Sequence, residues 1–167
     1  MKSIKSLFLI FSFIFVLSFA VTAQNLTALD GGKIDVQNQK DKIVVLAIGA
    51  SWLPLSAQQA VITNKLAKKF AGRDVVIYFV ATDSTSAKSK NYASDDELNS
   101  FVTRTKLTVP VLRDSDGGQT LKKYAIDQLP SFVILGKDGK PATEAFGGID
   151  PKSDIFTPIS EAIGKLL

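Results

Sequence analysis

The residue types that could do chemistry in this chain are limited by two absences, because its 167 residues include no cysteine and no histidine. Without cysteine there is no thiolate nucleophile, no disulfide, and no iron–sulfur or zinc–thiolate site. Without histidine the usual general base and the commonest metal ligand are missing. The chemistry that remains belongs to carboxylates, lysine, tyrosine, and the hydroxyl groups of serine and threonine.

Two acidic clusters are candidates for metal binding, and each has a simpler explanation. Asp114, Asp116 and Gly117 resemble part of a calcium loop, but no acidic residue closes it at the required spacing, so we expect a surface turn. The acidic run 95–97 suits the first turn of a helix, where negative charge is favourable. We therefore predict no metal site and no cofactor. The lysine-rich stretches have no interleaved aromatic residues, which argues against a nucleic-acid partner.

The first residues have the pattern of an export signal. Lys2 and Lys5 precede an apolar stretch over 7–19, and small residues up to Ala23 form a cleavage site. The alternative is a retained anchor, but the apolar stretch is shorter than the roughly 20 residues of a spanning helix. We expect residues 1–23 to be a signal peptide, with no membrane span after cleavage and a periplasmic or secreted product over 24–167.

The rest of the chain alternates between strand and helix patterns. Apolar or β-branched runs predict strands at 43–48, 75–81, 109–112, 131–135 and 143–146. Helical spacing and capping signals predict helices over 56–70, after Ser94 with a capping box to Glu97, over 121–125, and from Asp150–Pro151 with a kink or restart near Thr157 and Pro158. This order predicts an α/β fold with a central mixed β-sheet flanked by helices and an antiparallel hairpin at one edge.

Two segments carry a resemblance to a known family. The stretch 42–56, with the helix that follows it, resembles the strand–motif–helix of thioredoxin-like proteins, and is most similar to the exported TlpA/ResA-type and related redoxin families. The stretch 129–135 and the turn after it resemble a later strand and hairpin of the same proteins. The resemblance covers nearly all of 27–167 and implies a thioredoxin-like fold with a cis-proline loop at Pro130.

The chain departs from that family at the reactive centre. Where the family has Trp-Cys-x-x-Cys, this sequence has Trp52, Leu53, Pro54, Leu55 and Ser56. Thiol–disulfide exchange requires a thiolate, which neither a leucine nor an alcohol supplies, and no histidine is present to activate Ser56. Ala47 stands where thioredoxins carry an assisting acid. We therefore expect no catalytic residue in this motif and no thiol redox activity, although the family is one of thiol–disulfide oxidoreductases.

The function that remains is binding at the former reactive centre. The resemblance implies that an extended peptide or protein pairs with the cis-proline loop, where Trp52, Leu53, Leu129 and Pro130 would form an apolar groove. Trp52 is either such a contact or a residue that packs against the end of the sheet. One alternative is a role in cell redox homeostasis together with a cysteine-containing partner; others are chemistry on Ser56, tyrosine or carboxylates, and a degenerate copy that only folds.

Overall fold

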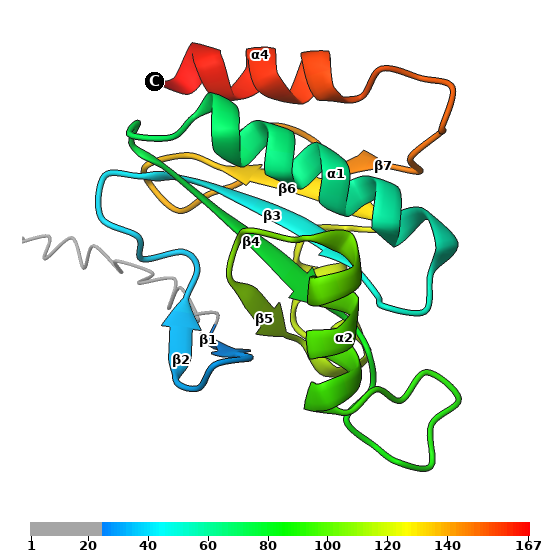
Figure 1. Cartoon of the computed structure of the whole chain (residues 1–167). Helices are drawn as coiled ribbons and strands as arrows, with labels where there is room; N and C mark the ends of the chain where they lie inside the picture. Colours follow the sequence, from blue (N-terminus) through cyan, green and yellow to red (C-terminus); the bar gives the residue numbers. More distant parts are fainter. Residues whose placement is uncertain (1–24) are drawn as a thin grey trace, which may run out of the picture.

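A seven-stranded sheet forms the centre of the computed structural model, which describes residues 25–167 (Figure 1). Its order is β2 (Lys33–Asp35), β1 (Asn25–Ala28), β5 (Val111–Arg113), β4 (Val75–Ala81), β3 (Ile43–Gly49), β6 (Ser131–Leu135) and β7 (Phe146–Gly147). Strand β4 is parallel to β3 and β5, whereas the pairs β1–β2, β1–β5, β3–β6 and β6–β7 are antiparallel. The predicted mixed sheet is confirmed; the predicted signal peptide lies outside the described residues.

The two central strands are the apolar runs that the sequence predicts as strands. Every residue of β3 is buried, and β4 is buried from Ile77 onward, as expected for strands covered on both faces. The helix α1 (Pro54–Lys69) connects them, and their parallel register pairs Ile43 with Val75 and Gly49 with Ala81. The predicted β-α-β unit is therefore confirmed, with a helix that begins two residues earlier than expected.

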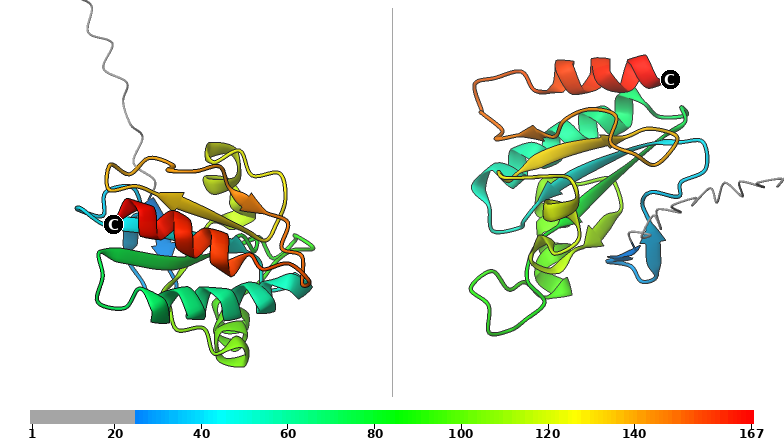
Figure 2. Two further views of the ribbon diagram at one scale, coloured as in Figure 1. Left: turned by 90° about the horizontal axis from the view of Figure 1, so that it is seen from above. Right: turned by 180° about the vertical axis from the view of Figure 1, so that it is seen from behind.

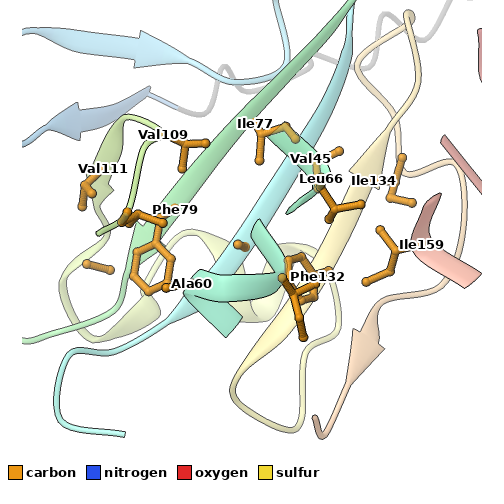
Figure 3. Packing of buried hydrophobic residues seen from close by; sticks show 14 of the residues in the cluster. Val45, Ala60, Leu66, Ile77, Phe79, Val109, Val111, Phe132, Ile134 and Ile159 are labelled. Atoms are coloured by element: carbon orange, nitrogen blue, oxygen red, sulfur yellow. The ribbon is translucent and has the colours of Figure 1, made fainter. Parts of the chain in front are cut away.

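Helices cover one face of the sheet much more fully than the other. Side chains from α1, α2 (Asp95–Thr105) and α4 (Phe156–Leu166) join one buried cluster with alternate residues of the central strands. Figure 2 shows α1 and α4 side by side over this face, and Figure 3 shows Leu66 and Ile159 meeting Val45 and Ile134 from the strands. The opposite face packs a second cluster that includes Tyr124, which follows the short helix α3 (Thr120–Lys123).

Local signals explain the ends of α2 and the turn after β5. Ser94 accepts a hydrogen bond from the Glu97 backbone N–H, and Glu97 accepts one from the Ser94 backbone N–H, so the predicted capping box is confirmed. A 3-10 turn (Ser115–Gly117) follows β5, at the position of the predicted surface turn. Within it Gly117 has a φ of 66°, a left-handed conformation that glycine adopts without strain.

Several expectations about the elements were wrong or incomplete. Asp150 and Pro151 begin a turn rather than the last helix, which starts at Phe156; Thr157 is not its cap but donates to the Asp154 carboxylate. Pro158 lies in the first turn of α4, where a backbone N–H would have no partner within the helix. Its missing N–H therefore costs no hydrogen bond. The second hairpin strand is only Phe146–Gly147, which pairs with Ser131 and Phe132 of β6, and an isolated bridge links Leu135 to Pro141. Strands β1 and β2 were not predicted.

Candidate functional site

The five-residue motif lies where β3 ends and α1 begins. Leu53 is the N-cap residue of α1, with extended backbone angles and no side-chain hydrogen bond to the helix, and Pro54 is in the first helical position. The Leu53 N–H donates to the Ala50 carbonyl at 3.1 Å, and the Leu53 carbonyl accepts from the Ser56 N–H at 3.0 Å. The side chain at position 53 therefore stands at the positive end of a 16-residue helix, where a thiolate would be stabilised and leucine has no charge to offer.

The motif presents an apolar surface and hides its hydroxyl group. Trp52 is 51% exposed, Pro54 is exposed, and Leu53 and Leu55 are half-buried. Ser56 is fully buried, and its Oγ accepts a hydrogen bond from the Ala50 N–H at 3.2 Å. A substrate has no access to this buried oxygen, and within residues 25–167 its hydrogen bond is to a backbone N–H rather than to a basic group, so Ser56 is a structural residue. Because half of the Trp52 side chain is exposed, packing against the end of the sheet does not bury it.

Gln59 bonds to both strand ends that lead into the loops of the site, and sequence reasoning missed it. Its side chain is fully buried, and Nε2 donates to the carbonyl oxygens of Ile48, at 3.2 Å, and Ser131, at 2.8 Å. Oε1 has no hydrogen-bond partner among the described residues. It lies over Gly49, where an added Cβ would stand 2.4 Å from Oε1 and 2.9 Å from the Ser56 Oγ. Gly49 therefore leaves the space that this amide fills.

Asp83 is a second buried residue that sequence reasoning missed, since it lies between the predicted strand 75–81 and the predicted helix after Ser94. Its carboxylate accepts hydrogen bonds from the Ser51 backbone N–H, at 3.0 and 3.1 Å to its two oxygens, and from the Ser51 Oγ at 2.6 Å. The residue is fully buried just after β4. Hydrogen bonds to an ionised acceptor are the strong ones, so Asp83 fixes the backbone immediately before Trp52.

The loop before β6 reaches the same end of the sheet as the motif. Ile48 and Ser131 are register partners in the antiparallel β3–β6 pair, so the chain after Ile48 and the chain before Ser131 leave the sheet together. The Leu129–Pro130 peptide bond is cis, Leu129 is half-buried and Pro130 is buried. The structure thus brings the four residues of the predicted groove to one end of the sheet, with Gln59 bonded to both strand ends.

The acidic residues considered as metal ligands have structural partners instead. The Asp114 carboxylate accepts from the backbone N–H groups of Gln119 and Thr120 and from the Thr120 hydroxyl, which fixes the start of α3. Asp95 forms an ion pair with Arg113. Over residues 25–167, no group of three acidic side chains is arranged to hold a metal ion. The same part of the chain contains no helix that is long and apolar enough to cross a membrane.

The topology and the site together define a thioredoxin-like protein, and a solved structure supports this. A secreted disulfide oxidoreductase of Mycobacterium tuberculosis, homologous to DsbE of E. coli, has a similar structure, with a TM-score of 0.65 and 22% identity over 86% of this chain and 96% of that one. A likeness at this identity shows the fold alone. The thioredoxin-like fold that the sequence predicts is confirmed.

Sequence relatives give the family. The AhpC/TSA family model matches residues 18–141, and the chain belongs to that family. The thiol-disulfide oxidoreductase ResA of Bacillus thuringiensis subsp. konkukian is 31% identical over 121 residues, which are 72% of this chain and 64% of ResA. The thioredoxin-like protein YneN of Bacillus subtilis is 30% identical over 115 residues, 69% of this chain and 62% of YneN. The chain thus spans less than two thirds of the length of these relatives.

The site therefore combines a thioredoxin-like scaffold with residues that cannot exchange thiols. The chain contains no cysteine at all, so neither an attacking nor a resolving thiol exists. What the arrangement offers is an exposed indole beside half-buried leucines, on loops whose backbone is fixed by buried hydrogen bonds.

Proposed function

We propose that this protein is an exported, redox-inactive thioredoxin-like module that binds an extended peptide segment of a partner protein at the former reactive centre. The observation that carries the proposal is the apolar surface at the start of α1, at the place where the family carries its reactive thiols. Leu53 caps the helix without a polar group, Trp52 beside it is half-exposed, and the one hydroxyl of the motif is buried. Extended peptides commonly bind where exposed apolar side chains lie next to backbone groups that can pair with the peptide.

The fixed loops favour binding because they lower its entropic cost. Asp83 holds the backbone at Ser51, and Gln59 bonds to both strand ends, so the loops that would contact a peptide are ordered before it arrives. Rigid binding surfaces lose less conformational freedom on association than mobile ones. Export is part of the proposal, supported by the charged and apolar pattern of residues 1–23 and by the secreted disulfide oxidoreductase that shares the fold.

The redox half of the proposal is tested by insulin-disulfide reduction with dithiothreitol as the reductant. We expect no turnover above the buffer control, because the chain has no thiol to form a mixed disulfide. Measurable acceleration by the cysteine-free protein would show that the chemical exclusion is wrong.

The binding half is tested with a library of labelled peptides about six residues long, the usual length of a strand. Fluorescence anisotropy would report the affinity, and the Leu53→Asp and Trp52→Ala variants should weaken every positive peptide. Aspartate is among the best N-cap residues, so Leu53→Asp should fold at least as well as the wild type while placing charge in the groove. Unchanged affinities in both variants would refute the groove.

Two matched control variants remove exposed apolar groups elsewhere. Val61→Asp places the same charge on the outer side of α1, where Val61 is 49% exposed, and Tyr92→Ala removes an aromatic ring that is 41% exposed. Both should bind peptides as the wild type does. Equal losses in the controls and in the groove variants would mean that binding is unspecific adhesion to apolar surface.

A second candidate function is an accessory role in redox homeostasis beside a cysteine-containing partner, which the similarity to the oxidoreductase ResA favours. In that case the protein should change the rate at which such a partner reduces insulin, although it has no activity alone. A partner rate that is the same with and without this protein would exclude that role for the partner tested.

A further inference from the structure

A cavity lies beside the loop of Pro130, on the side of the sheet away from α1. It has a volume of about 340 Å³ and lies between the segment 124–127, the segment 144–147 and the first residue of β6. Ser131 lines it, so the cavity begins one residue after Pro130. Ser131 and Gly147 are register partners in the β6–β7 pair, which places the cavity at the same end of the sheet as the groove.

The cavity combines apolar walls with two carboxylates. Tyr124, Ile126 and Ala145 belong to or pack against the second buried cluster and form its apolar part. Asp127 and Glu144 also line it, and both are exposed. Within residues 25–167 neither carboxylate is in an ion pair. Two carboxylates that line a partly apolar cavity, neither of them in an ion pair within the described residues, favour a cationic ligand.

We propose that this cavity receives a lysine or arginine side chain of the peptide bound at the neighbouring groove, with the charged head between Asp127 and Glu144. The inference rests on the proposed peptide binding and adds a sequence preference to it. Lysine and arginine are suited to such a place because their methylene stems cover apolar surface while their charged heads stay at the rim. The partner segment is therefore a basic extended peptide.

The groups near the cavity are consistent with this occupant. Burial in the first place, and the Asp35 carboxylate in the second, raise the pKa of Tyr124, so its phenol is uncharged at neutral pH and its ring serves as an apolar wall. The nearby Lys123 directs its ammonium group to the side-chain oxygen of Gln37. Since Asp127 and Glu144 are in no ion pair within residues 25–167, a cation of the bound partner can pair with them.

The experiment compares three peptides that differ at one position, which carries lysine, norleucine or glutamate, in anisotropy titrations of the full protein. We expect the lysine peptide to bind about five- to tenfold more tightly than the norleucine peptide, as two partly exposed ion pairs would give. The double variant Asp127→Asn/Glu144→Gln should remove that preference. It should leave the norleucine affinity unchanged, and in the wild type the preference should shrink with added salt.

A matched double variant, Asp74→Asn/Glu161→Gln, removes the same charge from exposed positions that do not line the cavity, and it should keep the preference. Equal binding of all three peptides to the wild type would overturn this inference and leave the proposed peptide binding intact. If no peptide of any sequence binds, the proposed function fails and this inference fails with it. If lysine amide alone binds as tightly as the lysine peptide, the cavity is a site for small amines. That result would overturn the inference that the cavity and the groove bind one peptide together.

Discussion

The packing of Gln59 over Gly49 makes a substitution of this glycine a direct test of how the site is held together. In Gly49→Ala the new Cβ would lie 2.4 Å from the Gln59 Oε1, 2.9 Å from the Ser56 Oγ and 3.3 Å from the Phe79 ring. Real carbon atoms do not approach this closely, so a neighbour must move. Gln59 is fully buried, and it cannot turn aside without giving up its bonds to Ile48 and Ser131.

The size of the effect follows from three contributions. Overpacking of a dense core costs about 1–3 kcal/mol. Each hydrogen bond that the Gln59 amide loses adds about 0.5–1.5 kcal/mol. The lower entropy of the unfolded chain with alanine returns about 0.4–1 kcal/mol. We expect the free energy of unfolding to fall by about 2 kcal/mol, which is a decrease of about 1 M in the urea midpoint at an ordinary denaturant slope.

Urea unfolding followed by Trp52 fluorescence measures this change, since Trp52 is the only tryptophan of the chain. Gly164→Ala in α4 is the matched control, because an added Cβ there meets nothing within 4 Å, and it should be neutral or stabilising. In a double-mutant cycle, Gly49→Ala and Gln59→Ala together should cost about 1–2 kcal/mol less than the sum of the two single changes. A Gly49→Ala midpoint within about 0.2 M of wild type, or strict additivity, would refute the role assigned to Gln59.

Three further predictions follow from the same contacts. Leu53→Cys/Ser56→Cys should reduce insulin measurably, because a thiol at the N-terminus of α1 would have a pKa lowered from about 8.5 into the range of about 3.5–7.5; no turnover by the folded double variant would show that more than these two positions blocks the chemistry. Asp83→Asn should lower the free energy of unfolding by about 1–3 kcal/mol in urea titrations, because an amide cannot accept every bond from Ser51; an unchanged midpoint would contradict the role of Asp83. Two hydrogen bonds from Ser94, first in size the one from its backbone and second the one from its side chain, lower the pKa of Glu97 below 4.5. The Glu97 carboxylate therefore contributes fully to the free energy of unfolding above pH 4.5, and this contribution is lost as the pH falls through the lowered pKa of the folded state. The unfolding temperature of Glu97→Gln should therefore lack the part of the decrease at acid pH that comes from Glu97. Equal profiles of unfolding temperature against pH in the variant and the wild type would refute this role of Glu97.

The parts of the fold that sequence reasoning predicted are those that depend on local pattern. The runs that became β3, β4 and β6 are long, apolar and bounded by turn residues, so their type and place were predictable. The short β1 has four residues and depends on pairing with β5, which is more than 80 residues away in the chain. Such a strand has little local signal of its own, because its hydrogen-bond partners are supplied by tertiary structure.

The start of α4 was mispredicted because two similar signals compete within a few residues. Asp150 followed by Pro151 has the pattern of a helix start, and so does Asp154, whose carboxylate accepts from both Thr157 groups. Local chemistry does not decide between them. The buried face formed by Ile159 and Ile163 decides, since it must lie over the sheet, and the turn at Asp150 brings the chain to that position.

The site was predictable at its surface and not beneath it. The motif and the cis-proline loop stand out in the sequence because they resemble segments of known proteins. Gln59 and Asp83 have no such pattern: each is a single polar residue in an ordinary helix or loop. Their importance lies in burial and in partners 11 to 72 residues away, which only the folded chain reveals.

No side-chain hydrogen bond that fixes the two loops comes from a position where the family carries a thiol, apart from the one at the Ser56 hydroxyl. The thiols can therefore be replaced while the hydrogen bonds that hold the loops stay in place. Two of the experiments distinguish this case from one in which the loop geometry has been lost as well. If Leu53→Cys/Ser56→Cys is active and the wild type binds peptides, the loops still have the geometry that a bound chain needs, and only the reacting atoms have been replaced. If the cysteine variant is folded but inactive and no peptide binds, the geometry has been lost as well. Gln59 and Asp83 hold both loops through hydrogen bonds within the chain, so we expect the first outcome.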